Sequence, residues 1–193
     1  MGRHRGRRNV TVAVLVFAFL ASAAVVRATN FGSIIYTTNP ESGAWLANNR
    51  THEVDLHNTT TEWGAAIQWA MTNALDPTVM NTVLVDGSVY DVRVVDDNYN
   101  NFLTAWTSCP PEAQVSGSHP YKVCRGQKIH VNLQNVSGYT VTQRRSLACH
   151  ELGHTVALRH VDNPDAASCM RVNVINRPTT YSGHDQNMIS SNY

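Results

Sequence analysis

The stretch His150–His160 reads HELGHTVALRH and holds three of the nine histidines in this 193-residue chain. His150 and His154 are four residues apart, so on a helix both imidazoles project from one face and can bind the same metal ion. His160 lies six residues further on, roughly 240° around a continued helix, and reaches that ion only if the chain turns back. The spacing therefore predicts a helix that ends near Ala157.

A helix that is merely rich in histidine is the alternative. In a chain of this composition, an HExxH match arises by chance with a probability of about 1%, and the third histidine lowers this to about 0.05%. Three neutral imidazoles leave the fourth position of a zinc ion open for water, whose pKa the metal lowers to about 7. Glu151 stands next to that position as general base, and then as general acid toward the leaving amine.

These residues resemble the motif of the metzincin metallopeptidases, HExxHxxGxxH followed by a methionine-containing turn. The resemblance implies that His150, His154 and His160 are the zinc ligands and that Glu151 is the general base. It also implies that Met170, in the Met-turn, is an apolar floor under the metal. The chain departs from the motif at residue 157, where alanine replaces glycine. In a left-handed turn, alanine costs about 1 kcal/mol more than glycine.

Alternating patterns predict the strands. Residues 52–57 and 128–133 alternate between apolar and polar side chains. Two further apolar runs, 82–85 and 89–95, are split by Asp86-Gly87, which predicts a β-hairpin. Residues 96–127 show no clear element, and a segment of this length is usually functional or held by a disulfide.

Helical patterns and capping residues predict three helices. An apolar stripe over residues 63–75 indicates an amphipathic helix that Thr59 caps, with Glu62 three residues on, and that Asp76-Pro77 ends. The metal-binding helix begins at Thr140 or Thr142, with Gln143 at a capping-box distance from Thr140. A last short helix begins after Ser182, with Asp185 at its third position.

The element order resembles the minimal metzincin domain, with residues 52–193 as the catalytic domain. This implies an α+β fold with a twisted mixed sheet, an active-site helix carrying HExxH, a Met-turn and a short C-terminal helix. In that family the strand at residues 128–133 rims the cleft and pairs with the substrate backbone. His130 would then line the cleft, although a plain exposed histidine is the favoured interpretation. His184 is a conceivable fourth ligand, but a role in the helix cap is favoured.

The first 28 residues have the pattern of a signal peptide. Four arginines precede an apolar run from Val10 to Val26, and a cut after Ala28 is expected. Arg7-Arg8 leaves the twin-arginine route open beside the general one, and an uncleaved anchor is the alternative to cleavage. Residues 29–51 indicate an extended segment leading into the domain, or a short propeptide.

Removal of the leader changes the charge of the chain. It takes away five arginines and no acids, so that 15 basic and 14 acidic residues become 10 and 14, a net charge near −4. This balance argues against a nucleic-acid partner. We expect a secreted protein without stable membrane insertion, monomeric by default, whose partner is a protein or peptide substrate.

The four cysteines allow three pairings and, in an oxidising compartment, favour two disulfides. The preferred pairs are Cys109–Cys124, which flank a loop rich in proline, and Cys149–Cys169, which would join the zinc helix to the Met-turn. Zinc binding by these thiols is the alternative, and the lack of a CxxC spacing speaks against it. Asp91, Asp96 and Asp97 suggest a calcium site, but no calcium-loop motif supports it and a solvated turn is favoured.

The leading hypothesis is a secreted zinc endopeptidase, in which a zinc-bound water activated by Glu151 hydrolyses peptide bonds. The first alternative is a catalytically weak or inactive scaffold that serves as a secreted binding protein, for which Ala157 is the one supporting residue. A second alternative, a zinc hydrolase of non-peptide amides, would use the same ligands. The sequence names neither the substrate nor the route of activation.

Overall fold

The computed structural model describes residues 30–35, 43–115, 122–161, 167–172 and 177–193. The expected signal peptide lies outside these residues, so its prediction is not tested. In the part of the chain that is described, no helix is both long and apolar enough to cross a membrane.

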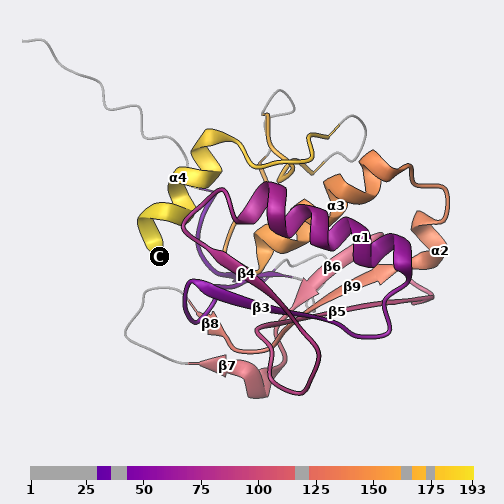
Figure 1. Ribbon diagram of the computed structural model, residues 1–193, viewed down its shortest axis with the longest axis horizontal. Helices are drawn as coiled ribbons and strands as arrows, with labels where there is room; N and C mark the ends of the chain where they lie inside the picture. Colours follow the sequence, from indigo (N-terminus) through magenta and orange to yellow (C-terminus); the bar gives the residue numbers. More distant parts are fainter. Residues whose placement is uncertain (1–29, 36–42, 116–121, 162–166, 173–176) are drawn as a thin grey trace, which may run out of the picture.

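Five strands form one mixed sheet. In their order across the sheet they are β4 (Asn81–Val85), β3 (Thr51–Leu56), β5 (Val92–Asp97), β9 (Gln127–Asn132) and β6 (Ala105–Ser108). The first four run parallel to their neighbours, and β6 runs antiparallel to β9 at one edge. Figure 1 shows the twisted sheet below the two long helices. The prediction of an α+β fold with a mixed sheet is therefore confirmed.

The inner face of the sheet is lined by β-branched residues that are at most 1% exposed: Val54, Val92, Val94, Ile129 and Val131. Such side chains have restricted rotamers and pack well on a pleated surface, which explains why these runs form strands. The predicted strands at residues 52–57 and 128–133 correspond to β3 and β9.

The predicted hairpin between residues 82–85 and 89–95 is wrong. The strand β3 lies between β4 and β5 and pairs in parallel with both. Val54 on β3 is opposite Leu84 on one side and Val92 on the other, so β5 begins at the level where β4 ends. Asp86-Gly87 thus belongs to a short crossover over β3. A turn dipeptide fixes a local change of direction, but it does not choose the strand's partner.

The segment 96–127, for which no element was predicted, contains the edge strand β6. It also holds a 3₁₀ turn at Pro111–Ala113 and the small strands β7, Gln114–Val115, and β8, Val123–Cys124, which pair with each other. Because β6 occupies the edge, β9 is an interior strand. The expectation that residues 128–133 form the edge strand that pairs with substrate is therefore wrong, because β6 occupies that edge of the sheet.

Two helices cover the inner face of the sheet and pack against each other, α1 at Thr61–Ala70 and α3 at Val141–His154. A π-helical turn at Met71–Leu75 continues α1, and Asp76 caps its end. The apolar stripe predicted for this helix is buried in the core. A single-turn helix α2, Leu133–Val136, connects β9 toward α3.

The start of α1 differs from the prediction, because Thr60 and not Thr59 is the capping residue. The Thr60 side chain accepts no helix N–H. Instead, Asp96 on β5 accepts hydrogen bonds from the Thr60 backbone N at 2.8 Å and from its hydroxyl at 2.6 Å. The Thr59 hydroxyl donates to the Val94 carbonyl at 2.9 Å. The helix is therefore capped by a neighbouring strand, which a local motif cannot reveal.

Several described residues of the range 29–51 are buried: Phe31, Leu46 and Ala47 join the main core, and Trp45 packs in a small second cluster with Cys109 and Cys124. Phe31 is 2% exposed and forms an isolated bridge with Leu158, and Trp45 is also 2% exposed. The short strands β1, Ile34–Ile35, and β2, Gly43–Ala44, pair with each other. The Trp45 backbone N donates to the His154 carbonyl at 2.9 Å. This segment therefore supports the end of α3, the helix that carries His150 and His154.

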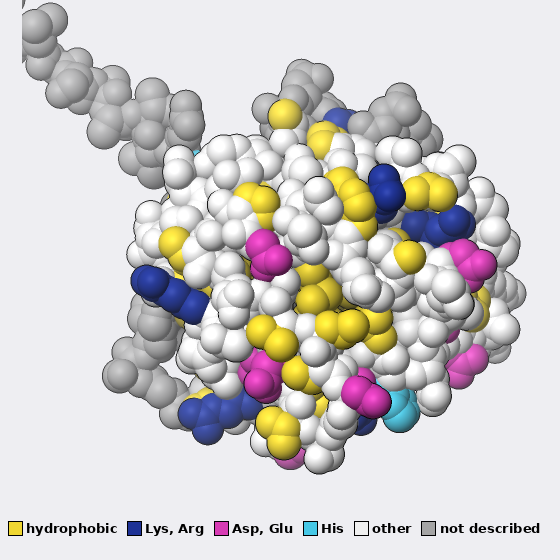
Figure 2. Space-filling view, viewed as in Figure 1, with side chains coloured by type: hydrophobic (Ala, Val, Ile, Leu, Met, Phe, Trp, Pro, Cys, Tyr) yellow, Lys and Arg dark blue, Asp and Glu magenta, His cyan; other side chains and the backbone are white. Residues whose placement is uncertain are grey.

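The last helix, α4, spans Gly183–Asn192 and begins with the predicted capping box between Ser182 and Asp185. Asp185 is fully buried and also accepts hydrogen bonds from the Asn30 amide and the Ser168 hydroxyl, both at 2.6 Å. The Asp185 carboxylate thus connects Asn30, Ser168 and the start of α4. The face of the molecule in Figure 2 carries few charged side chains, in keeping with a chain that is 15% charged.

Candidate metal centre

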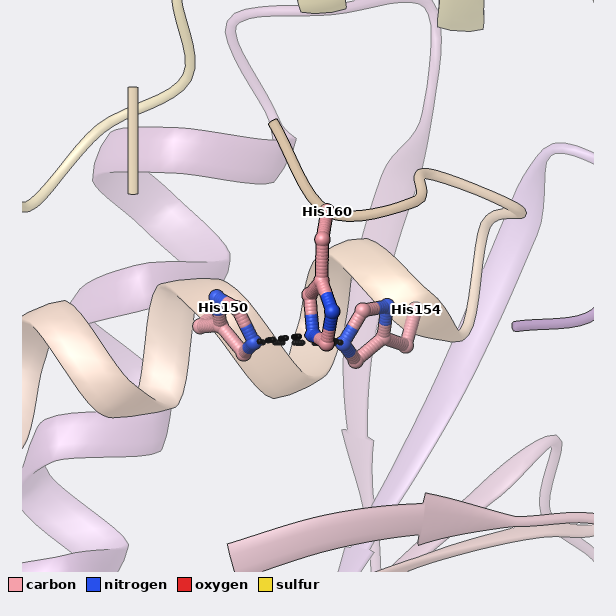
Figure 3. Close-up of side chains that lie close together, drawn as sticks. All are labelled: His150, His154 and His160. Carbon is pink, nitrogen blue, oxygen red and sulfur yellow. Dashed lines mark hydrogen bonds between the residues drawn. The ribbon is translucent and has the colours of Figure 1, made fainter. Parts of the chain in front are cut away.

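The helix α3 positions the first two predicted ligands. It begins with a capping box in which the Thr140 hydroxyl accepts from the Gln143 backbone N at 3.3 Å, and the Gln143 side chain accepts from the Thr140 backbone N at 2.8 Å. His150 and His154 follow on its last turns and are 5% and 3% exposed. As the spacing predicts, both imidazoles project from the same side of the helix (Figure 3).

A chain reversal brings His160 back to the other two histidines. The helix ends at His154, and Ala157 has a φ of 65°, the left-handed conformation expected there. The Nε2 atom of His154 lies 3.2 Å from that of His150 and 3.2 Å from that of His160, and the third separation is 3.1 Å. In Figure 3 His160 enters from the loop above the helix and points into the same space. The three atoms are close enough to hold one metal ion.

Alanine is tolerated at residue 157 although its backbone favours glycine. Its side chain is fully buried in the core, so the methyl group offsets part of the left-handed strain of about 1–2 kcal/mol. Hydrogen bonds on both sides also hold the turn, from the Gly32 N to the Ala157 carbonyl at 2.9 Å and from the Leu158 N to the Gly153 carbonyl at 2.9 Å. The departure from the glycine motif therefore leaves the geometry of the cluster intact.

Backbone carbonyls set the tautomers of the two helix histidines. His150 Nδ1 lies 2.8 Å from the Cys169 carbonyl, and His154 Nδ1 lies 2.8 Å from the Leu158 carbonyl. A carbonyl only accepts, so each Nδ1 carries the proton and each Nε2 presents a lone pair to the cluster. Two lone pairs face each other at 3.2 Å, an arrangement that a cation between them stabilises.

Burial keeps these imidazoles neutral. Desolvation lowers the pKa of His154 to about 3, with a further decrease from the neighbouring His160, and it holds the pKa of His150 well below its ordinary value. The positive charge of Arg177 also contributes to lowering the pKa of both. Metal ligands must be unprotonated, so the site favours the binding form of histidine across the neutral pH range.

Glu151 lies beside the cluster on the side of the sheet edge. It is 3% exposed, and its Oε2 accepts a hydrogen bond from the Thr107 hydroxyl on β6 at 3.0 Å. Burial raises the pKa of Glu151 to about 7, while the Thr107 hydrogen bond and the charge of Arg177 act in the opposite direction. A carboxyl with a pKa near neutrality can both take up and release a proton.

Met170 packs against the helix α3 at Gly153. It is fully buried, and a Cβ added to Gly153 would overlap its sulfur and lie 3.2 Å from Tyr181 Cε1. Gly153 is therefore required by the close approach of the Met-turn to the helix, between the two helix histidines. The Tyr181 hydroxyl donates to the Cys149 carbonyl at 3.0 Å from the same side.

We expect Gly153→Ala to destabilise the protein by about 1–3 kcal/mol, because overpacking of Met170 outweighs the better helix propensity of alanine. Denaturant unfolding measures the change. Gly64→Ala on α1 is the matched control, since a Cβ there meets Leu56 Cδ1 at an ordinary 3.5 Å. The control should be more stable by up to about 1 kcal/mol. Equal stabilisation by both substitutions would contradict the close contact with Met170.

Both preferred disulfides are present, Cys109–Cys124 and Cys149–Cys169. Among the described residues no cysteine is free. The first joins the segment after β6 to β8. The second joins α3, one residue before His150, to the residue before Met170, and the Cys169 carbonyl is the acceptor for His150. The disulfide therefore ties the carbonyl that accepts from His150 to the helix that carries His150.

Opening the Cys149–Cys169 bridge with two alanines should lower the free energy of unfolding by about 3 kcal/mol, because it closes a loop with a sequence separation of 20. The same variant should bind metal more weakly, since the His150 acceptor is no longer tied to the helix. Opening Cys109–Cys124, with a separation of 15, is the control. This control should lower the free energy of unfolding by a similar amount and leave the metal affinity unchanged. Equal metal affinity in both variants would contradict the proposed role of the Cys149–Cys169 bridge in positioning His150.

Three residues of this centre were not singled out from the sequence, namely Thr107, Arg177 and Tyr181. They lie on β6 or in the segment after Met170, far from the motif in sequence, and a lone threonine, arginine or tyrosine carries no spacing signal. Arg177 is 5% exposed, and burial lowers its pKa to about 10, so it is positively charged at neutral pH.

His130 is not the plain exposed histidine favoured by the sequence. It is half-buried, stacks on Trp106 with ring centroids 4.7 Å apart, and its ring nitrogens lie 3.0 Å from the Ser108 hydroxyl and 3.2 Å from the Tyr99 hydroxyl. Burial lowers its pKa to about 4. Asn132, the next polar residue in the alternating pattern of 128–133, is fully buried. The antiparallel neighbour β6, which the sequence did not reveal, covers this side of β9.

The remaining candidates do not join the cluster. Within the described ranges, the histidine triad is the one group of three or more His, Cys, Asp or Glu residues close enough to hold a metal, and it excludes His184. Asp91 is 7% exposed and accepts from the Glu53 N at 3.0 Å, and Asp96 is 8% exposed. Asp91 and Asp96 are thus buried acceptors for backbone N–H groups, not parts of the solvated turn that the sequence favoured, whereas Asp97 is exposed, as that interpretation expects.

No protein-family model matches the chain, and no curated protein matches it.

Proposed function

We propose that the histidine cluster binds a catalytic zinc ion. A tetrahedral zinc, with Zn–N distances of about 2.0–2.1 Å, separates its nitrogen ligands by about 3.3–3.4 Å. The three Nε2 separations of 3.1–3.2 Å are close to this value. Among the described residues, three imidazoles converge and no fourth protein ligand joins them. Three ligands with a fourth position for substrate or water are typical of a catalytic site, whereas structural zinc sites use four protein ligands.

We further propose that the protein is a zinc metalloendopeptidase of the metzincin type. The observation that carries this proposal is the position of Glu151, a buried carboxyl that accepts a hydrogen bond from the Thr107 hydroxyl and directly follows the first ligand. When bound, zinc supplies a Lewis acid that polarises a carbonyl and lowers the pKa of water. The HExxH motif, the reversal at Ala157 and the placement of Met170 support the family assignment.

In this proposal, the protein's own residues handle the proton and the substrate. Glu151 Oε2 takes a proton from water and later delivers it to the leaving amine. The Thr107 hydroxyl, 3.0 Å from Oε2, orients the carboxyl. The carbonyls of Cys169 and Leu158 hold two of the imidazoles in the binding tautomer, and Met170 packs against Gly153, which lies between them on the helix.

The edge strand β6 suits the binding of an extended peptide. Among the described strands, β6 pairs with β9 on one side and with no strand on the other. It also carries Thr107, which donates a hydrogen bond to Glu151. A peptide that adds to a free sheet edge gains backbone hydrogen bonds regardless of its sequence. We therefore propose protein or peptide substrates, and secretion into an oxidising compartment, where disulfides persist.

The alternative of an inactive binding scaffold rested on Ala157 alone. Because Ala157 adopts the left-handed turn and His160 reaches the cluster, no feature of the described residues favours that alternative.

Hydrolysis of casein and of quenched peptides, with and without a chelator, tests the proposed function. We expect activity from the mature chain, loss of activity with chelator, and recovery on addition of zinc. A chain that contains stoichiometric zinc and hydrolyses no peptide would overturn the proposal and favour the scaffold.

A further inference from the structure

A groove lies between the first turns of α1 and α3. It consists of two hollows with volumes of about 280 and 260 Å³, and Glu62 and Arg144 line both of them. Arg144 precedes His150 by six residues, which is roughly 9 Å along α3 and 240° around it. The groove is therefore on a different side of α3 from the metal cluster.

The groove has an apolar floor. Its apolar lining residues are Ala65, Ala66 and Val141 in the first hollow and Trp63, Leu133 and Val136 in the second. Trp63, Ala66 and Val136 are at most 4% exposed, whereas Val141 is 54% exposed. Buried side chains thus form the bottom of the groove, and Val141 belongs to its open rim. An apolar group that covers this surface gains free energy from the water it displaces.

Arg144 and Arg145 give the first hollow a positive charge, and both side chains are half-buried. Arg144 Nη1 donates to the Tyr139 carbonyl at 2.5 Å, and the Arg145 guanidinium lies over the Trp69 ring, 5.0 Å from its centroid. Figure 2 shows basic side chains beside hydrophobic ones over the first turns of α3. The bond to Tyr139 uses one of the five N–H donors of Arg144, so the guanidinium can also bind a ligand.

Glu62 does not cancel this charge. It is exposed, and the ion pair found among the described residues is Arg93–Asp55, so Glu62 and Arg144 are not in contact. Solvent screens the charge of an exposed carboxylate more than that of a half-buried guanidinium. The first hollow therefore combines an apolar floor with a net positive charge, which complements a ligand that is both apolar and anionic.

We propose that this groove binds a medium-chain aliphatic carboxylate. The carboxylate group would lie on Arg144, whose planar fork of N–H groups fits its two oxygens. The hydrocarbon chain would cover Ala65, Ala66 and Val141 in the first hollow. Each hollow is slightly smaller than the usual small-molecule site of about 300–1,000 Å³, so the ligand has on the order of ten non-hydrogen atoms. This site goes beyond the proposed peptidase function and does not use the metal.

A crevice that merely results from the packing of α1 on α3 makes a different prediction. Such a crevice would take up any apolar chain weakly and would not distinguish a charged head group from a neutral one. A carboxylate site must prefer octanoate over octanamide, which has the same chain and a neutral head. It must also prefer octanoate over acetate, which has the same head without the chain.

Calorimetric titration of the purified protein with octanoate, octanamide and acetate measures both preferences. We expect octanoate to bind about 10- to 100-fold more tightly than either of the other two compounds, because it alone has both the chain and the charge. The titration is repeated with a chelator. Octanoate binding that disappears with the chelator would place the carboxylate on the metal and overturn the inference.

Two variants test the two halves of the site. Arg144→Gln should reduce the affinity for octanoate to that for octanamide, whereas Arg125→Gln, at an exposed position outside the groove, should not change it. Ala65→Phe fills the first hollow and should weaken octanoate binding at least about 10-fold. Gln68→Phe, also exposed on α1 and absent from the lining of the groove, is its control and should bind octanoate like the wild type.

Ala65→Phe keeps the test decisive if Arg144→Gln does not fold, because residue 65 is exposed on α1 and tolerates a larger side chain. Octanoate affinity that stays at the wild-type level in Ala65→Phe would overturn the inference. Equal affinities for octanoate and octanamide in the wild-type protein, or no binding of octanoate at millimolar concentrations, would overturn it as well.

Discussion

Replacing Glu151 with glutamine is expected to lower kcat/KM for peptide hydrolysis by about 10²–10⁴-fold, which corresponds to about 3–5 kcal/mol of activation free energy. The physical reason is that glutamine keeps the shape of the side chain but cannot accept a proton. Its carbonyl can still accept the hydrogen bond from the Thr107 hydroxyl, so the local packing should persist. Kinetics with a quenched peptide at substrate concentrations below KM give the ratio directly.

The same substitution should leave the metal and the fold in place. Glu151 does not belong to the group of ligand atoms formed by His150, His154 and His160, so zinc content should stay close to one ion per chain. Burial already raises the pKa of Glu151, so a neutral replacement should not lower the free energy of unfolding. Glu62→Gln, at an exposed position on α1, is the control and should keep full activity. Hydrolysis at the wild-type rate by Glu151→Gln would refute the proposed mechanism.

The second large effect is expected from His154→Ala, which should abolish stoichiometric zinc binding and with it the activity. His154 provides one of three ligand nitrogens and lies 3.2 Å from each of the other two. Two imidazoles alone bind zinc far more weakly than three in a rigid, neutral arrangement. Metal analysis of the purified protein after dialysis measures the loss.

Two histidines outside the cluster serve as controls for this variant. His184→Ala, at the start of α4, and His130→Ala, on β9, should each retain one zinc ion per chain, because neither belongs to the metal-binding group. Stoichiometric zinc that persists in His154→Ala would place the metal elsewhere. His184 would then be the first residue to test, since the sequence offers it as a fourth ligand.

The sequence by itself determined which histidines converge in the candidate metal centre. The spacing of His150, His154 and His160, together with a reversal near Ala157, predicted that three imidazoles converge, and the structure brings them together. It also predicted both disulfides, the capping boxes at Thr140 and Ser182, and the core face of α1. All of these are patterns with a fixed period or a short range, in which local geometry decides which side chains meet.

What only the tertiary structure decided is which distant segments meet that centre. The hairpin was mispredicted because the turn at Asp86-Gly87 does not reveal that β3 lies between its neighbours. The edge strand β6, with Thr107 on Glu151, and the buried Arg177 were missed for the same reason. Contacts across many residues depend on the packing of the whole chain and leave no periodic signal in the sequence, so strand order, burial and the electrostatic surroundings of the site had to come from the fold.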